Sequence, residues 1–342
     1  SAADCTGENV QDAAVFAHEF GHVLALPDWY HWIDPSLGPA GRRWVLGCWA
    51  LMAAGSWGCG PVGESREPYG PAHMVGWSKN FLGWLDPTDP GEVWNETIEL
   101  PPIQTTGEAL RIPLDDNGLD YLWIEYRDQV GFDHAIPAAG VLMYRENARI
   151  GRWSKPQPEE DGPYPLTMLE QDDNRSLLLM APEGGSRGEP GDAWGVGGAT
   201  GALNAESSPP LRTPVLDWTH VQIHEVRVEE DKAVVVLSTG KTPQLIARPE
   251  TVDVTQIRTF FEGVRIAGGT GPYTGVGDLP EGFYFDAEGD QLRVAGSLRD
   301  DQPRTFTFAV RDAFGSESNE VTLTVAATGE WTTTAEALSL IH

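Results

Sequence analysis

Two histidines four residues apart, His18 and His22, constrain the fold of the segment around them more than any other feature of the chain. In an α-helix this spacing places both imidazoles on one face, one turn apart, where they can bind a single metal ion. Glu19 stands between them, in the position of a general base that takes a proton from water. This H-E-x-x-H spacing is typical of zinc hydrolases, and it predicts a helix from about residue 9 to 25.

A zinc site of this kind needs a third protein ligand. Pro27 cannot donate a backbone hydrogen bond and disfavours a helical residue before it, so the helix should end near Leu26. A turn there can return the carboxylate of Asp28 to the metal, and we therefore predict Asp28 as the third zinc ligand. His31 and Asp34, slightly further along the chain, are the alternatives.

The motifs that follow the helix carry a family resemblance. The window HEFGHVLALPD (18–28) precedes the methionine-containing stretch CWALMAAGSW (48–57) and then PAHMVGWSKNFLGWL (71–85), expected as a second helix over 71–83. In this order the motifs resemble the immune-inhibitor-A-like, metzincin-type secreted zinc metallopeptidases of bacteria and archaea. The stretch DYLWIEYRDQVGFDHAIPAAGVLMYRE (120–146) is similar to a strand-turn-strand element that follows the catalytic unit in that family. The resemblance covers roughly residues 10 to 240.

The resemblance implies a zinc endopeptidase that hydrolyses protein or peptide substrates, with Glu19 as general base and Met52 as an apolar support beneath the metal. One position departs from the family pattern, because Ala25 stands where glycine is usual. Glycine adopts a positive φ freely and alanine does not. Either the turn is therefore made differently, at Pro27, or the third ligand is shifted. His73 could donate to the transition state or support a ligand from behind, or it could be an ordinary helix histidine.

The segment before the motif leads to a further expectation about partners. In this group a sheet and a helix precede the zinc-binding helix, and the 17 residues before His18 cannot form them. We therefore expect a second chain, or the upstream portion of the same precursor, to complete the catalytic domain. A second functional hypothesis is a non-catalytic extracellular surface or adhesion protein with a relic protease domain. The intact Glu19 argues against that relic.

Cysteine usage and charge bear on location. The chain has three cysteines; Cys48 and Cys59 flank the methionine turn and could form a disulfide, although pairing of Cys5 with either is equally allowed. The formal net charge is −28, which disfavours nucleic acids and anionic membranes as partners. No apolar run is long enough to predict a membrane span. A secreted, extracellular or cell-surface protein is expected.

Two acidic clusters could bind Ca²⁺ through carboxylate and amide oxygens. Both clusters have sequences that are also common in turns, and neither matches an EF-hand. The possible calcium ligands are Asp115, Asp116, Asn117 and Asp120 in the first cluster, and Asp172, Asp173 and Asn174 in the second.

The pattern of strands and turns predicts a multidomain α+β protein. A truncated metzincin-like catalytic subdomain of helix and loop should be followed by two all-β sandwich domains, the second of them an Ig/cadherin-like module. The expected boundaries are 1–91 for the zinc-binding part, 92–240 for the first sandwich, 241–250 for a linker, 251–327 for the second sandwich and 328–342 for a tail.

Overall fold

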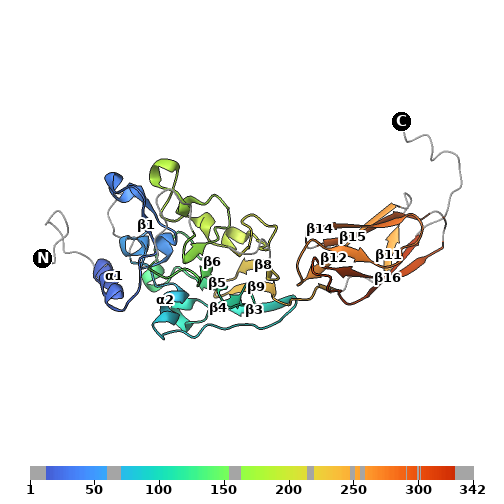
Figure 1. Ribbon diagram of the computed structural model, residues 1–342, viewed down its shortest axis with the longest axis horizontal. Coiled ribbons are helices and arrows are strands. Elements are labelled where there is room, and N and C mark those ends of the chain that lie inside the picture. Colours follow the sequence, from blue (N-terminus) through green and yellow to red (C-terminus); the bar gives the residue numbers. More distant parts are fainter. Residues whose placement is uncertain are drawn as a thin grey trace. The chain divides into compact units, whose positions relative to one another are not determined.

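The computed structural model describes residues 13–59, 71–153, 163–213, 219–246, 251–254, 259–289, 291–298, 300 and 302–327. Cys5, the first residues of the predicted helix 9–25 and the expected tail 328–342 lie outside these residues. The described chain is mostly β, with few helices and several separate sheets (Figure 1). Contacts divide it into two compact units, Ser1–Thr239 and Gly240–His342.

The first unit contains the α-helices α1 (Ala13–Val23), α2 (Gly76–Phe81) and α3 (Ile103–Thr106). The expected helix over 71–83 is wrong in its first turn, since α2 begins at Gly76. The reason is that the preceding residues bond to the methionine turn. Ala72 donates its N–H to the carbonyl of Gly55 (2.9 Å), and the carbonyl of His73 accepts from Leu51 (3.1 Å). Backbone groups used in this way cannot join a helical ladder.

All strand pairs of the first unit are antiparallel. One sheet has the order β3 (Glu96–Leu100), β9 (Ala233–Ser238), β8 (Gln222–Val228); a second has the order β4 (Leu110–Pro113), β5 (Asp120–Arg127), β6 (Gly140–Asn147), β7 (Leu166–Met168); a third pairs β1 (His31–Trp32) with β2 (Arg42–Arg43). The run SLLLMAP, which looks like a strand in the sequence, forms two 3₁₀ turns instead. There the side chains of Asn174 and Glu170 accept the N–H groups of Ser176 and Leu177.

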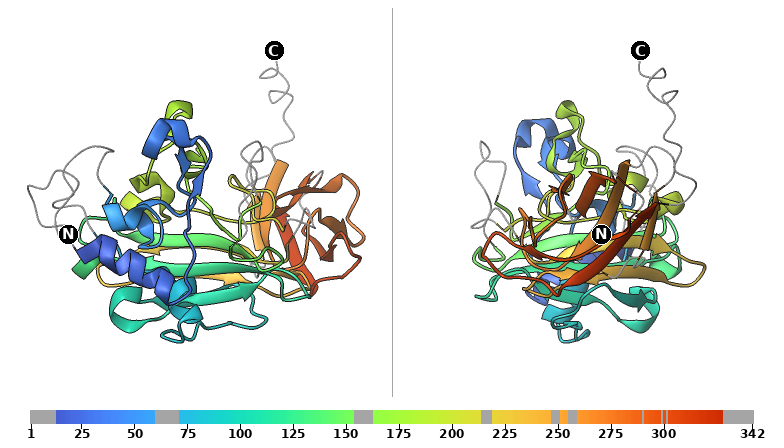
Figure 2. Two further views of the ribbon diagram at one scale, coloured as in Figure 1. Left: turned by 60° about the vertical axis from the view of Figure 1, so that its left-hand side comes forward. Right: turned by 90° about the vertical axis from the view of Figure 1, so that its right-hand side faces the viewer.

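The β4–β7 sheet is the structural centre of the first unit because both of its faces are buried. On one face, Leu122 and Ile124 of β5 pack with residues of β8 and β9. On the other face, Trp123 of β5 and Tyr144 of β6 pack with Trp29, Trp49 and Met52 from the segment that follows α1. Figure 2 shows the long green strands β5 and β6 running through the middle of this unit. The sheet therefore supports the segment that follows α1.

The second unit is a pair of four-stranded sheets around one apolar core. The first sheet has the order β10 (Gln244–Leu245), β12 (Thr259–Ala267), β15 (Gln291–Ser297), β14 (Phe283–Glu288); the other has the order β11 (Thr251–Val254), β17 (Val321–Ala327), β16 (Arg304–Arg311), β13 (Thr274–Val276). The β11–β17 pair is parallel and the others are antiparallel. Among the described helices of the whole chain, none is long and apolar enough to span a bilayer.

Candidate metal centre

Helix α1 carries His18 and His22 on the face that packs against the methionine turn. Gly21 lies between them and permits this close packing, because a Cβ atom at that position would stand 2.5 Å from the Sδ of Met52. Met52 itself is 1 % exposed and accepts a backbone hydrogen bond from Trp29 (2.7 Å). Met52 thus lies against the helix turn that bears the histidines, where the sequence predicts an apolar support.

The helix ends at a residue with left-handed backbone geometry. Ala25 has φ 65°, its N–H donates to the carbonyl of His22 (2.9 Å), and the N–H of Leu26 donates to Gly21 (3.0 Å). The alternative of a turn made at Pro27 instead is therefore wrong. The chain makes the turn at the position where glycine is usual and accommodates alanine in a conformation that costs it free energy.

Replacing Ala25 with glycine should stabilise the protein. The left-handed conformation costs an L-residue about 1–2 kcal/mol, and the extra freedom of glycine in the unfolded chain offsets part of that gain, leaving about 0.5–1 kcal/mol. Urea unfolding of Ala25→Gly measures the change. Ala17→Gly, at an exposed position in the middle of the same helix, is the matched control and should destabilise by about 1 kcal/mol. A loss of stability in Ala25→Gly would contradict the assigned turn.

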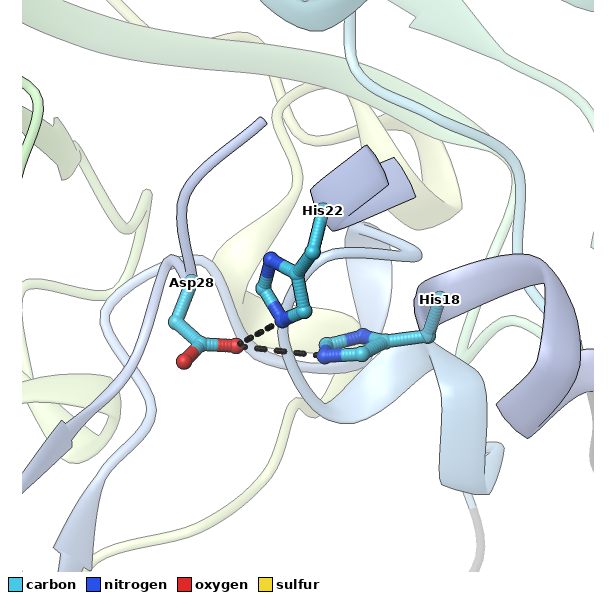
Figure 3. A group of neighbouring side chains, drawn as sticks. All are labelled: His18, His22 and Asp28. Carbon is cyan, nitrogen blue, oxygen red and sulfur yellow. Dashed lines mark hydrogen bonds and ion pairs between the residues drawn. The ribbon is translucent and has the colours of Figure 1, made fainter. Parts of the chain in front are cut away.

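Three acceptor atoms converge at the end of α1. Nε2 of His18 lies 3.1 Å and Nε2 of His22 lies 3.4 Å from the same Oδ1 of Asp28 (Figure 3). Each histidine binds a backbone carbonyl through its other nitrogen: Nδ1 of His18 is 2.9 Å from the oxygen of Leu51, and Nδ1 of His22 is 2.8 Å from the oxygen of Leu26. A carbonyl only accepts, so these contacts assign the Nδ1–H tautomer and direct the Nε2 lone pairs toward Asp28.

That arrangement favours a cation between the three side chains. Two imidazole nitrogens and one carboxylate oxygen form a donor set that zinc takes in catalytic sites, and carbonyls that hold Nδ1–H are the usual outer support of metal-binding histidines. When no metal is bound, a proton can supply the positive charge between these side chains. Burial lowers the pKa of His18, but hydrogen bonds to Asp28 and to the Leu51 carbonyl outweigh burial, so its net shift is upward.

The centre is open to solvent on one side. The side chain of His18 is 6 % exposed, but those of Asp28 and His22 are 22 % and 31 % exposed. Glu19 is also exposed, and its charge acts on His18 and on Tyr30. A water molecule and a substrate can therefore reach the three acceptors from solvent.

The centre contains two further residues, Tyr30 and Arg42, for which the sequence predicted no role. Burial and the negative charge of Asp28 raise the pKa of Tyr30 to about 12, and the Tyr30 hydroxyl also bonds to Asp28. Its ring stacks on that of His18 with centroids 6.4 Å apart, and the Arg42 guanidinium carbon lies 4.7 Å from the centroid of the Tyr30 ring. Tyr30 stands two residues after Asp28, and that spacing is the only sequence signal for its role.

The methionine turn is tied down from several directions. Cys48 and Cys59 form a disulfide, which is one of the pairings that the sequence left open. Below the turn, Arg127 of β5 is fully buried and donates to the carbonyl of Trp49 (2.8 Å) while it pairs with Asp133 (2.7 Å) and Glu125 (3.3 Å). Although burial opposes the charge, this pairing holds the pKa of Asp133 below its usual value.

The other candidate zinc ligands and donors have different surroundings. His31 is buried and stacks on Tyr164, and Asp34 caps a 3₁₀ turn by accepting from the N–H of Ser36 (2.9 Å). His73 lines an apolar cavity of about 230 Å³ with Ala13 and Ala17 of α1. Burial, and then the charges of Lys79 and Arg127, lower the pKa of His73 to about 4. A neutral imidazole in that cavity favours the interpretation of His73 as an ordinary histidine over that of a transition-state donor.

The first predicted calcium cluster contains a cation of the chain itself. Arg149 pairs with both Asp115 and Asp120, whereas Asp116 and Asn117 are exposed. We therefore do not propose a metal ion at this cluster.

The second predicted cluster is rearranged. Asp172 lies with Glu170 and Asp192, and an oxygen of each carboxylate is within 4.8 Å of the others. Asp173 instead accepts from Ser208, and Asn174 donates to Asp172 (3.0 Å). Burial and the charge of Asp192 raise the pKa of Glu170 to about 8, and burial raises the pKa of Asp192 to about 7.

Comparison with known families adds one finding about this region. Residues 1–85 match the model of the immune inhibitor A peptidase M6 family, catalytic domain. The match takes in α1, Asp28, the methionine turn and α2, and it covers 85 of the 342 residues. The N-terminal part of the chain is thus similar to a peptidase catalytic domain. No curated protein matches the chain.

The similar chains among solved structures have low sequence identity to this chain. A candidate alpha-galactosidase from Bacteroides fragilis is 17 % identical with a TM-score of 0.21, over 25 % of this chain and 17 % of that one. The titin M10–obscurin-like 1 Ig complex is 17 % identical with a TM-score of 0.22, over 27 % and 100 %. The human desmocollin-1 ectodomain is 12 % identical with a TM-score of 0.21, over 33 % and 23 %. These scores are too low to assign a fold.

Proposed function

We propose that the chain is a secreted zinc-dependent endopeptidase that hydrolyses peptide bonds in protein or peptide substrates. The observation that carries the proposal is the convergence of Nε2 of His18, Nε2 of His22 and Oδ1 of Asp28, with each Nδ1 held by a backbone carbonyl. The similarity of residues 1–85 to a peptidase catalytic domain supports the same chemistry.

In this proposal the chain itself supplies the ligands, the base and the support. His18, His22 and Asp28 hold the zinc ion, which when bound polarises a peptide carbonyl and lowers the pKa of water. Glu19 takes the proton of the attacking water and passes it to the departing amine. Met52 fixes the helix turn beneath the ligands. The Tyr30 hydroxyl orients the Asp28 carboxylate.

The proposed partners and location follow from the surface. Helix α1 exposes Phe16 (54 %), Phe20 (60 %) and Val23 (75 %), an apolar surface that fits the predicted second polypeptide or upstream portion. The net charge of −28 disfavours nucleic acid. One disulfide among the described cysteines suits an oxidising, extracellular setting.

Removal of zinc should abolish hydrolysis of a fluorescent casein substrate. We expect dialysis against 1,10-phenanthroline to lower the rate by at least about a hundredfold, because the metal provides both carbonyl polarisation and the activated water. One equivalent of zinc should restore the rate. Magnesium at the same concentration is the control and should not restore it. Hydrolysis that persists after complete zinc removal would contradict the proposal.

The same assay distinguishes the proposed enzyme from a non-catalytic surface or adhesion protein. An adhesion protein with a relic site would bind zinc and hydrolyse no substrate, whether full-length protein or short peptide. Turnover that depends on both zinc and Glu19 would exclude the relic.

A further inference from the structure

The carboxylates of Glu170, Asp172 and Asp192 form a cluster well separated in sequence from the candidate zinc ligands. Glu170 follows β7, Asp172 begins the next turn, and Asp192 ends the 3₁₀ turn Pro190–Asp192. An oxygen of each lies within 4.8 Å of the other two. Two of the three are inside the protein, since Glu170 is 3 % and Asp192 is 0 % exposed.

Backbone hydrogen bonds between two loops bring these carboxylates together. Asp172 donates its N–H to the carbonyl of Gly191 (3.1 Å), and Gln171 donates to the carbonyl of Asp192 (3.3 Å). The approach is so close that a Cβ atom on Gly191 would lie 2.1 Å from Oδ2 of Asp172. A side chain at Gly191 would therefore require the Asp172 carboxylate to move. The two loops therefore hold three carboxyl groups together, although the charged forms of these groups repel one another.

One oxygen in this cluster is enclosed and has no donor. Oδ2 of Asp192 accepts from Nε1 of Trp49 (2.8 Å) and from the N–H of Glu189 (2.9 Å). Oδ1 of the same carboxylate is buried and has no hydrogen-bond partner among the described residues. Buried carboxylate oxygens are normally satisfied, so an oxygen left in this way, on a carboxylate grouped with two others, indicates a missing donor or cation.

The chain supplies no such partner within its described residues. None of the three carboxylates forms an ion pair with a lysine or arginine there, and the donors to Glu170 are a hydroxyl and an N–H, both at 3.3 Å. The Asp115–Asp120 pair differs in this respect, because Arg149 forms an ion pair with each of its two carboxylates. Uncompensated buried charges of one sign are strongly unfavourable, and a bound cation removes that cost.

We propose that Glu170, Asp172 and Asp192 bind a hard divalent cation, with Ca²⁺ preferred. The ligands are all oxygens, which suit Ca²⁺ and Mg²⁺ rather than zinc. Buried Glu170 and Asp192 leave little room for the several waters that Mg²⁺ retains, whereas Ca²⁺ accepts flexible carboxylate ligation. Exposed Asp172 provides the entry side.

The position gives the ion a structural role. Asp192 accepts from Trp49 of the methionine turn, and the carbonyl of Arg187, in the loop before it, accepts from the N–H of Cys48. The carbonyl of Leu177, on the other loop, accepts from Trp44 (3.0 Å). A cation that joins the two loops thus stabilises the segment that supports the candidate zinc centre, without contact with that centre.

The test measures calcium binding in the full chain with its zinc held at one equivalent. Addition of CaCl₂ to protein freed of calcium should raise the melting temperature by about 5 °C at a hundredfold excess over the dissociation constant. The same concentration of MgCl₂ should give a smaller shift. Tb³⁺, which takes the same oxygen ligands, should emit when tryptophan is excited, since Trp49 contacts Asp192, and Ca²⁺ should quench that emission by displacement.

Two variants remove the charge with little change of shape, Asp192→Asn and Glu170→Gln. Each should abolish the calcium-dependent shift and the Ca²⁺-sensitive Tb³⁺ emission, and each should equal or exceed the calcium-free wild type in melting temperature because repulsion is relieved. Asp173→Asn, at the adjacent carboxylate that contacts Ser208, is the matched control and should retain both signals. The absence of any calcium-dependent shift in the wild type, or its retention in both cluster variants, would overturn the proposal.

Discussion

Replacing Glu19 with glutamine is expected to lower kcat/KM for peptide hydrolysis by at least about a hundredfold, since positioned proton transfer contributes about 10²–10⁴ to such rates. Glutamine keeps the size and the hydrogen-bonding shape of the side chain but cannot take a proton. Glu19 is exposed on α1, and its side chain is not among the zinc-ligand candidates. The variant should therefore fold normally and bind zinc like the wild type.

The matched control for this experiment is Glu206→Gln. Glu206 is also an exposed glutamate of the first unit, remote in sequence from α1, and its loss should leave kcat/KM unchanged. Rates for both variants are measured on one quenched peptide, with zinc content and melting temperature determined on the same samples. Near-normal turnover in Glu19→Gln would show that the proton is transferred by another group.

Replacing Arg127 with methionine should cost the protein about 3–5 kcal/mol of unfolding free energy. Arg127 is fully buried between Asp133 and Glu125 and also donates to the Trp49 carbonyl. Methionine has a similar length but no charge, so it leaves two buried carboxylates without a cation and frees the methionine turn from β5. We expect reduced zinc affinity as a secondary effect, because the turn also holds His18 through Leu51.

Arg227→Met is the control for burial. Arg227 pairs with Glu225 and Glu229 at the surface, and its side chain is 41 % exposed. Exposed ion pairs contribute about 0–1 kcal/mol, so this variant should unfold at almost the wild-type urea concentration. Equal destabilisation by the two substitutions would contradict the assigned role of the buried network.

Local patterns were sufficient to predict the zinc-ligand candidates. The spacing of His18 and His22 depends on helix geometry alone, and Asp28 is only six residues beyond, so the whole group is set by one helix and one turn. Ala25 shows that even in this segment the sequence does not determine the backbone conformation. The sequence left open whether the turn is made at Pro27 or the third ligand is shifted, and the backbone conformation shows that the turn is made at Ala25.

Contacts between distant segments were not predictable in the same way. The sequence places Glu125 and Arg127 in a strand, but it does not indicate that the β4–β7 sheet is covered on both faces. Asp192 joins Asp172 across 20 residues of loop, so a search for adjacent acidic residues finds Asp173 instead. Register and loop packing decide these positions, and neither has a local sequence signal.

Zinc content shows whether His18, His22 and Asp28 bind the metal ion. The full chain is loaded with excess zinc, dialysed against metal-free buffer and analysed by plasma mass spectrometry, beside His22→Ala and the control His134→Ala. His134 is an exposed histidine of the first unit, outside the convergent group. We predict about one zinc per chain in the wild type and in His134→Ala, and a loss of most of it in His22→Ala. A wild type that retains no zinc, or a His22→Ala variant that retains all of it, would exclude a zinc centre at these residues.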